Sequence, residues 1–177
     1  MPPPDSLTPV SAQGFFSVDR AGLIYQVIVY HYYDPEEYYA GLIHKPLEYE
    51  EEMLRLYSVM QELLDSERVV VNNVRVRPEV YSVSLEHRGD PREPYITFII
   101  LFKAPLHSGR NVYENWYEDE VAEYDYEVYW VFPPGTRIIE VVTSSEYQLL
   151  GDDNILLLWA RRGDRTGGYE RIVFELP

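Results

Sequence analysis

The densest run of groups able to do chemistry lies between residues 113 and 130, where acids alternate with tyrosine and tryptophan. Glu123, Asp125 and Glu127 occupy alternate positions. On a strand their carboxylates would share one face, with neighbours about 6.6 Å apart at ~3.3 Å of rise per residue. Glycoside hydrolases place two carboxylates at a comparable separation. Every strand with acids at alternate positions gives this spacing, so the pattern also fits a solvated acidic face, and we favour that interpretation.

A second candidate group precedes the first, in a predicted loop. Aromatic residues there adjoin three consecutive acids: Tyr113, Trp116, Tyr117, Glu118, Asp119 and Glu120. Such rings could stack on a sugar, hold a cation or receive an arginine-rich partner. Alternatively, the rings fold back to cap the domain while the acids face water. The acids lack the spacing of an EF-hand loop, so the sequence predicts no dedicated calcium site.

One compact basic loop stands out in this acidic chain. It contains Arg161, Arg162 and Arg165. If it contacted the acidic stretch 114–127 of a neighbouring copy, a salt-sensitive head-to-tail assembly would form. The alternative is that the two loops are solvated independently of each other.

Other site signatures are missing from the sequence. Cysteine is absent, and the four histidines are scattered, with no pair at helical ligand spacing. We therefore predict no metal site and no cofactor. Neither a Gly-rich phosphate loop nor a Gly-x-Ser-x-Gly elbow occurs. The Arg-Gly-Asp triplets at 88–90 and 162–164 coincide with predicted turns, so we interpret them as turn sequences.

The charge balance limits the partners of this protein. The formal net charge of the 177 residues is −15 and the sequence pI is about 4.6. A duplex nucleic-acid binder needs a surplus of Lys and Arg to neutralise phosphates, and an anionic membrane surface also attracts basic segments. Both partners are therefore disfavoured. The charge fits solubility, with a basic partner, a cation or mimicry of nucleic acid as the sharper alternatives.

Residue usage also suggests a thermophilic source. Arginine outnumbers lysine 13 to 2, and tyrosine occurs 17 times. An arginine bias of this kind occurs in some thermophilic families. We therefore expect a melting temperature above roughly 90 °C.

The elements that must position these groups are arranged around the eight residues Tyr95–Phe102. This run is apolar or aromatic on both alternating faces except at Thr97, and it is far shorter than the roughly 20 residues of a membrane span. It predicts a central strand that is covered on both faces. A helix over Pro46–Asp65 is expected to cover one of them, with this apolar stripe: Leu47, Met53, Leu54, Tyr57, Met60 and Leu64.

The N-terminal part precedes that helix. Residues 1–14 hold four prolines, no basic residue and no apolar h-region, so we predict no signal peptide. This favours a cytoplasmic location and leaves an extracytoplasmic one open. We expect residues 1–20 to be a flexible tail, and residues 21–177 to form one domain with a helical insertion at 34–65. Asp34 as N-cap and Pro35 at the first helical position predict the start of a short helix there.

The rest of the chain alternates short apolar runs with turn residues, as β-sandwiches do. Asn72-Asn73 predicts a tight hairpin, because asparagine tolerates positive φ. The other predicted strands cover residues 23–33, 80–87, 122–132, 137–142, 155–160 and 170–176.

Residues 124–176 follow a recognisable order of segments. An aromatic strand ends at Pro133-Pro134-Gly135, and then come an Ile/Val strand, a Gly-Asp-Asp-Asn turn, the strand Ile155–Trp159 and a closing strand. This order resembles that of immunoglobulin-like β-sandwich modules of prokaryotic proteins. The resemblance implies a fold and a tendency toward structural or binding roles, and it implies no active site.

Together these patterns predict an α+β, mainly β protein. It is an immunoglobulin-like antiparallel β-sandwich with an N-terminal helical insertion packed on one sheet. The predicted function is a non-catalytic protein-interaction or structural module that presents the acidic, aromatic surface at 113–127 to a protein partner. The alternative is a carbohydrate-active enzyme or a carbohydrate-binding module that uses paired carboxylates and exposed rings. A mimic of nucleic acid ranks third.

Overall fold

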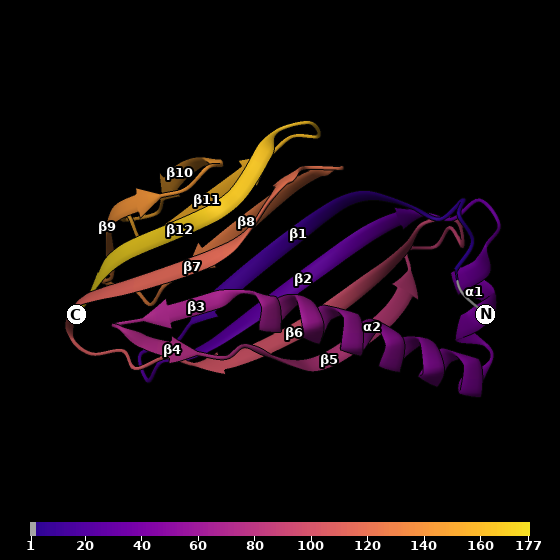
Figure 1. The fold of residues 1–177 in the computed structure, drawn as a ribbon, viewed down its shortest axis with the longest axis horizontal. Coiled ribbons are helices and arrows are strands. Elements are labelled where there is room, and N and C mark those ends of the chain that lie inside the picture. The colour runs from indigo at the N-terminus through magenta and orange to yellow at the C-terminus, as the bar shows by residue number, and fades with distance from the viewer. Residues whose placement is uncertain (1–2) are drawn as a thin grey trace.

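The computed structural model describes residues 3–177 as two β-sheets and two helices (Figure 1). The strand order is β10-β11-β8-β1-β2-β6-β5 in the seven-stranded sheet and β4-β3-β7-β12-β9 in the five-stranded sheet. The predicted mainly β sandwich, with a helix packed on one sheet, is confirmed. The elements are β1 (Thr8–Val18), β2 (Leu23–Tyr33), α1 (Tyr38–Ile43), α2 (Pro46–Ser66), β3 (Arg68–Val71), β4 (Val74–Val76), β5 (Glu79–His87), β6 (Pro94–Lys103), β7 (Gly109–Val121), β8 (Asp125–Val131), β9 (Arg137–Val142), β10 (Glu146–Leu150), β11 (Ile155–Ala160) and β12 (Arg165–Leu176).

The prediction of a tail over residues 1–20 is wrong for most of its length. Residues 8–18 form β1, which lies between β8 and β2 in the seven-stranded sheet, while residues 1–2 lie outside the described part of the chain. Ala12 and Val18 of this strand are buried, and its register shifts between Pro9 and Ser11. β1 runs parallel to β8, whereas the other strand pairs are antiparallel, so the predicted antiparallel sandwich has one exception.

Residues 124–176 are divided between the two sheets. β8, β10 and β11 belong to the seven-stranded sheet, and β9 and β12 belong to the five-stranded one. The predicted hairpin at Asn72-Asn73 is also confirmed. β3 pairs with β4 in antiparallel register, and the two asparagines take φ values of 49° and 64°.

One face of the seven-stranded sheet is covered by two pieces side by side, α2 and the five-stranded sheet (Figure 1). Ile96, Phe98 and Ile100 of β6 share an apolar cluster with α2. Phe102, the next alternate residue, belongs to the cluster between the two sheets. Alternate residues of a strand point to the same face. The helix and the second sheet therefore form one covering layer, and the predicted packing of the helix on the strand 95–102 is confirmed.

The opposite face of that strand is not covered, which corrects the expectation that both faces are. Ile99 and Leu101 point away from α2 and the second sheet and are only half-buried. They are shielded by neighbours within their own sheet, such as Val27, which pairs with Ile99. Contacts with neighbouring strands of the same sheet therefore account for the partial burial of this apolar face.

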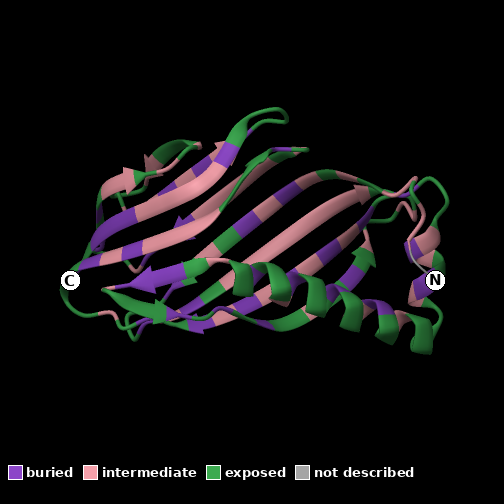
Figure 2. Ribbon diagram, viewed as in Figure 1, coloured by how far each residue is buried: buried purple, intermediate pink, exposed green. Residues whose placement is uncertain are grey.

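Helix α2 has the predicted extent but a different buried face. Glu52, Leu56, Met60 and Leu64 are buried, whereas Leu47 is 78% and Leu54 is 62% exposed. Figure 2 shows the exposed outer side of this helix beside the buried strand β3. The predicted stripe is therefore wrong at Leu47, Leu54 and Tyr57, whereas Met60 and Leu64 are buried as predicted.

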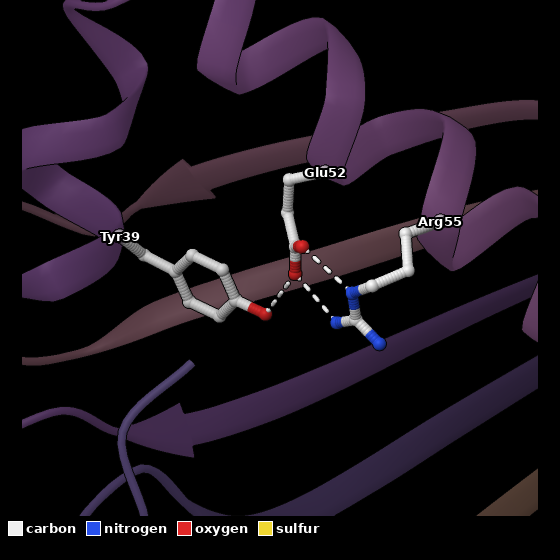
Figure 3. Close-up of polar contacts among 3 residues, drawn as sticks. All are labelled: Tyr39, Glu52 and Arg55. Carbon is white, nitrogen blue, oxygen red and sulfur yellow. Dashed lines mark hydrogen bonds and ion pairs between the residues drawn. The ribbon is translucent and has the colours of Figure 1, made fainter. Parts of the chain in front are cut away.

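The buried Glu52 is matched by two donors (Figure 3). Its carboxylate accepts hydrogen bonds from the Tyr39 hydroxyl at 2.9 Å and from Arg55 at 2.7 Å (Nε) and 2.6 Å (Nη2). Burial, and then the charge of Glu52, raise the pKa of Tyr39. The cluster ties α1 to α2. The first helix begins at Tyr38 rather than at Asp34; Asp34 is buried, and its Oδ2 accepts a hydrogen bond from the Tyr39 amide at 2.9 Å.

Candidate functional site

The predicted loop before residue 120 is strand β7, so its residues point to opposite faces of the five-stranded sheet. Tyr113 is buried in the cluster between the sheets, and Tyr117 lines an interior cavity. Trp116 packs on the other face, with its ring centroid 5.2 Å from that of Tyr169 and the Arg68 guanidinium 5.1 Å from its ring. The acids at 118–120 are exposed at the end of the strand.

The nine residues predicted to form one acidic, aromatic surface are therefore divided among several places. Tyr113 and Tyr117 face the interior, and Trp116 faces outward from the five-stranded sheet. Asp125 and Glu127 lie together in β8, beside a surface groove, while Glu123 is exposed in the turn before that strand.

The groove lies on the uncovered face of the seven-stranded sheet and has a volume of about 630 Å³. The register of the sheet explains its composition. Gln13 of β1 lies opposite Glu127, which lies opposite Trp159 of β11. Side chains from six segments of the chain line the groove. Six residues from five of these segments carry the argument: Gln13, His31, Arg88, Asp125, Glu127 and Trp159.

Both carboxylates of the groove are held by donors of the same chain. Asp125 accepts hydrogen bonds from the Arg161 side chain at 3.0 Å and from the Arg162 amide at 2.9 Å. These bonds lower the pKa of Asp125. Glu127 accepts a hydrogen bond from Gln13 Nε2 at 2.7 Å. An ionised, paired Asp125 is a poor proton donor, so the groove is better suited to binding than to acid catalysis.

The basic loop is close to the acidic residues of its own chain. Arg161 pairs with Asp125, and Arg165 lies opposite Val121, next to the exposed acids of β7. Arg162 contributes its backbone amide to the same carboxylate. Head-to-tail assembly through this loop stays a prediction.

The formal charges of the groove balance. Asp125 and Glu127 face Arg88 and Arg161, two acids against two bases. Burial, and then the charge of Arg88, lower the pKa of His31, so its imidazole is neutral at pH 7. The remaining polar lining is neutral, with amides at Gln13 and Gln148. The groove therefore fits a neutral polar ligand better than an ion.

A charge-free apolar row crosses the same open face next to the groove. Cross-strand pairing places its members side by side over five strands, in the order Ile99, Val27, Phe15, Tyr129 and Leu157. The rings of Phe15 and Tyr129 are stacked, with centroids 5.3 Å apart. The adjacent row carries Leu101, Tyr25, Ser17, Val131 and Ile155. We call these ten residues the open-face patch.

The sequence analysis missed most of this surface. It found Asp125, Glu127 and Arg161, but not Gln13, Phe15 or Trp159 as site residues. β1 was assigned to the tail, and its parallel pairing with β8 joins segments more than 100 residues apart. The pair Phe15-Phe16 within the supposed tail was the one available indication of a strand.

Neither a cluster of metal-ligating side chains nor a membrane-spanning helix is found among residues 3–177. Among residues 3–177, no group of three or more His, Asp or Glu side chains could hold a metal ion. No helix of the described residues is both long and apolar enough to cross a bilayer.

No protein-family model matches this sequence, and no curated protein matches it. Solved structures do show a resemblance to segments of larger proteins. One is an aminopeptidase N family protein from Idiomarina loihiensis (10% identity, TM-score 0.41), which matches over 92% of this chain and 29% of its own. A putative protease from Parabacteroides distasonis has 8% identity and a TM-score of 0.37, and the match covers 97% of this chain and 41% of that protein. An M1 zinc metallopeptidase from Deinococcus radiodurans has 9% identity and a TM-score of 0.40, and the match covers 98% of this chain and 43% of that protein. The chain spans less than half the length of each.

Proposed function

We propose that this chain is a non-catalytic binding module that engages a protein partner through the open-face patch. The observation that carries the proposal is the uninterrupted apolar row from Ile99 to Leu157, which the rest of the described chain leaves uncovered. Single exposed apolar residues are ordinary on soluble proteins, whereas contiguous apolar patches of several hundred square ångströms mark interaction sites.

The surroundings of the patch indicate the chemistry of the partner. Glu79 and Glu86 are exposed on the edge strand β5, and Glu146 is exposed on the opposite edge strand, β10. An interface usually has an apolar centre and a polar rim. With glutamates at both edges and a net charge of −15, the complementary partner has an apolar centre bordered by Lys and Arg.

A matched pair of substitutions tests this proposal. Val131 of the patch is 38% exposed, and Val142, on the outer face of the other sheet, is 42% exposed. We expect the tagged full chain to form a complex larger than 20.9 kDa in extracts of its source cells. Val131→Glu should reduce recovery of the partner at least tenfold, because a charge is forced into the apolar centre. Val142→Glu should leave recovery unchanged.

Two results would contradict the proposal. One is a wild-type chain that stays monomeric in the source extract. The other is equal loss or equal retention of the partner in both variants, which would place the contact elsewhere or make it non-specific. Circular dichroism of both variants should show wild-type strand content, since both positions are exposed.

The groove favours a second candidate function, the binding of a neutral glycan. Its balanced charges, its amides at Gln13 and Gln148 and the ring of Trp159 suit sugar hydroxyls and a sugar face. Trp159→Ala should then abolish retention on a glycan array, while Tyr147→Ala, which removes an exposed ring from β10, should not. Absence of any glycan retention by the wild-type chain would remove this candidate and leave the first one intact.

A further inference from the structure

The layer that covers the seven-stranded sheet is built from two pieces, and a cavity of about 190 Å³ lies where they meet. Leu64, near the end of α2, lines one side, and Val69, at the start of the five-stranded sheet, lines another. Phe102 and Val128 of the seven-stranded sheet also line it. The cavity is separate from the open-face groove, which is on the other side of that sheet.

Two carboxylates, two amides (Asn115 and Gln26) and the Ser145 hydroxyl form the polar lining of this cavity, together with tyrosines. Glu170 of β12 lies directly opposite Asn115 of β7. The Asn115 amide nitrogen donates a hydrogen bond to Glu67 at 2.8 Å, and its Oδ1 is shut off from solvent without a hydrogen-bond partner. No Arg, Lys or His is among the lining residues. The lining therefore carries two carboxylates and no positive charge to neutralise them.

Tyrosines complete the wall. Tyr113 is only 4% exposed and lines the cavity. Tyr117 of the same strand and Tyr126 of β8 line it as well. Aromatic faces attract cations, and a phenol oxygen accepts a hydrogen bond from one.

The electrostatics agree with this geometry. Burial, and then the charge of Glu67, raise the pKa of Glu170 to about 7. Burial also raises the pKa of Glu67, although its hydrogen bond from Asn115 opposes the shift. The charges of Glu170 and Glu67 both add to the rise in the pKa of Tyr117.

We infer that this cavity binds the protonated amino group of a small primary amine. An ammonium group brings the positive charge that the carboxylates lack and three N–H donors for Glu170, Glu67 and the Tyr113 oxygen, which line the cavity. A quaternary ammonium would supply the charge without the donors. Liquid water takes ≈ 30 Å³ per molecule, so the volume admits about six non-hydrogen atoms. Ethylammonium fits this limit, and long polyamines do not.

Calorimetry with ethylammonium on the full chain at pH 8.5 tests the inference. Glu170 is then ionised and the amine is still protonated, so we expect saturable binding to one site. Glu170→Gln keeps the side-chain shape and removes the charge, and it should weaken binding at least tenfold. Glu175→Gln is the matched control, because Glu175 is exposed on the same strand. Tyr113→Phe should weaken binding severalfold by removing one acceptor.

The probes also separate the sources of the ammonium group. If a lysine-containing peptide is retained and ethylammonium displaces it, the site takes the lysine side chain of a partner. If ethylammonium binds and the peptide does not, the site takes free amines. Three results would overturn the inference. They are binding of neutral 1-propanol as tight as that of ethylammonium, no saturable binding of either ammonium source, and unchanged ethylammonium binding in Glu170→Gln. None of these results depends on the open-face patch.

Discussion

The two faces of strand β6 have similar apolar content and different surroundings. On one face, Ile96, Phe98 and Ile100 of β6 are almost fully buried beneath α2. On the other, Ile99 and Leu101 of the same strand are half-exposed. The difference shows that an apolar face in a strand does not by itself imply a second layer. Neighbouring strands provide part of the burial, and the remaining exposed surface is available for a partner.

The largest effect expected from this comparison is on stability. Ile100→Ala should lower the free energy of unfolding by about 3 to 4 kcal/mol, because the side chain is fully buried and leaves a cavity. Ile99→Ala, the matched change on the open face, should cost about 1 kcal/mol or less. Urea unfolding of the two variants measures both values. Equal losses would mean that both faces are covered in solution.

The second effect concerns the cavity within the covered face. Because the pKa of Glu170 is raised to about 7 in the folded protein, the folded state binds a proton more tightly than the unfolded one. The contribution of this group to stability is therefore present below about pH 4.5 and is lost as the pH rises toward 7. Glu170→Gln should stabilise the protein by up to about 3 kcal/mol at pH 8.5 and by much less at pH 5.

The measurement is urea unfolding of Glu170→Gln and of Glu175→Gln at both pH values. The exposed control should follow the wild type at each pH. A stabilisation of Glu170→Gln that is the same at pH 5 and pH 8.5 would show that Glu170 does not titrate between them.

The third and smallest effect lies in the helical part of the covering layer. Tyr39→Phe removes one of the hydrogen bonds to the buried Glu52, which Arg55 still neutralises. A hydrogen bond to a charged group contributes about 1.5 to 3 kcal/mol, and we expect a loss near the lower value. Tyr81→Phe, at an exposed position of β5, should change the stability little. Thermal unfolding followed by circular dichroism compares them, and equal stabilities would show that the Tyr39 bond contributes nothing.

Much of the fold could be predicted because its elements have local patterns. Helix α2, the Asn72-Asn73 hairpin and the mainly β sandwich followed from periodicity and turn residues. Strand β1 was missed because Phe15 and Phe16 are adjacent and most of its other residues are small or polar, so no clear alternation is visible. Its stability comes from β2 and β8 on either side. β7 was taken for a loop because its polar residues obscure the alternation.

The candidate site was predicted less well than the fold. Asp125, Glu127 and Arg161 are near one another within one chain. The sequence analysis had instead paired the basic loop with the acids of a neighbouring copy or left both loops solvated. The neighbours of these three residues, Gln13, His31 and Trp159, come from other strands. The pairing and register of these strands cannot be predicted from local patterns in a single sequence. The interior cavity was missed for the same reason, since Glu67 and Glu170 approach each other only through β7.

The most direct test of the open-face patch is site-specific photocrosslinking in the source cells. A photoreactive phenylalanine analogue replaces exposed Phe15 in the patch or, as control, exposed Tyr147 of β10, which lies beside the buried Leu158 on the opposite face of the same sheet. We predict a discrete crosslinked protein from position 15 and none from position 147. The same crosslinked product from both positions, or none from position 15 while the partner is present, would contradict the proposal.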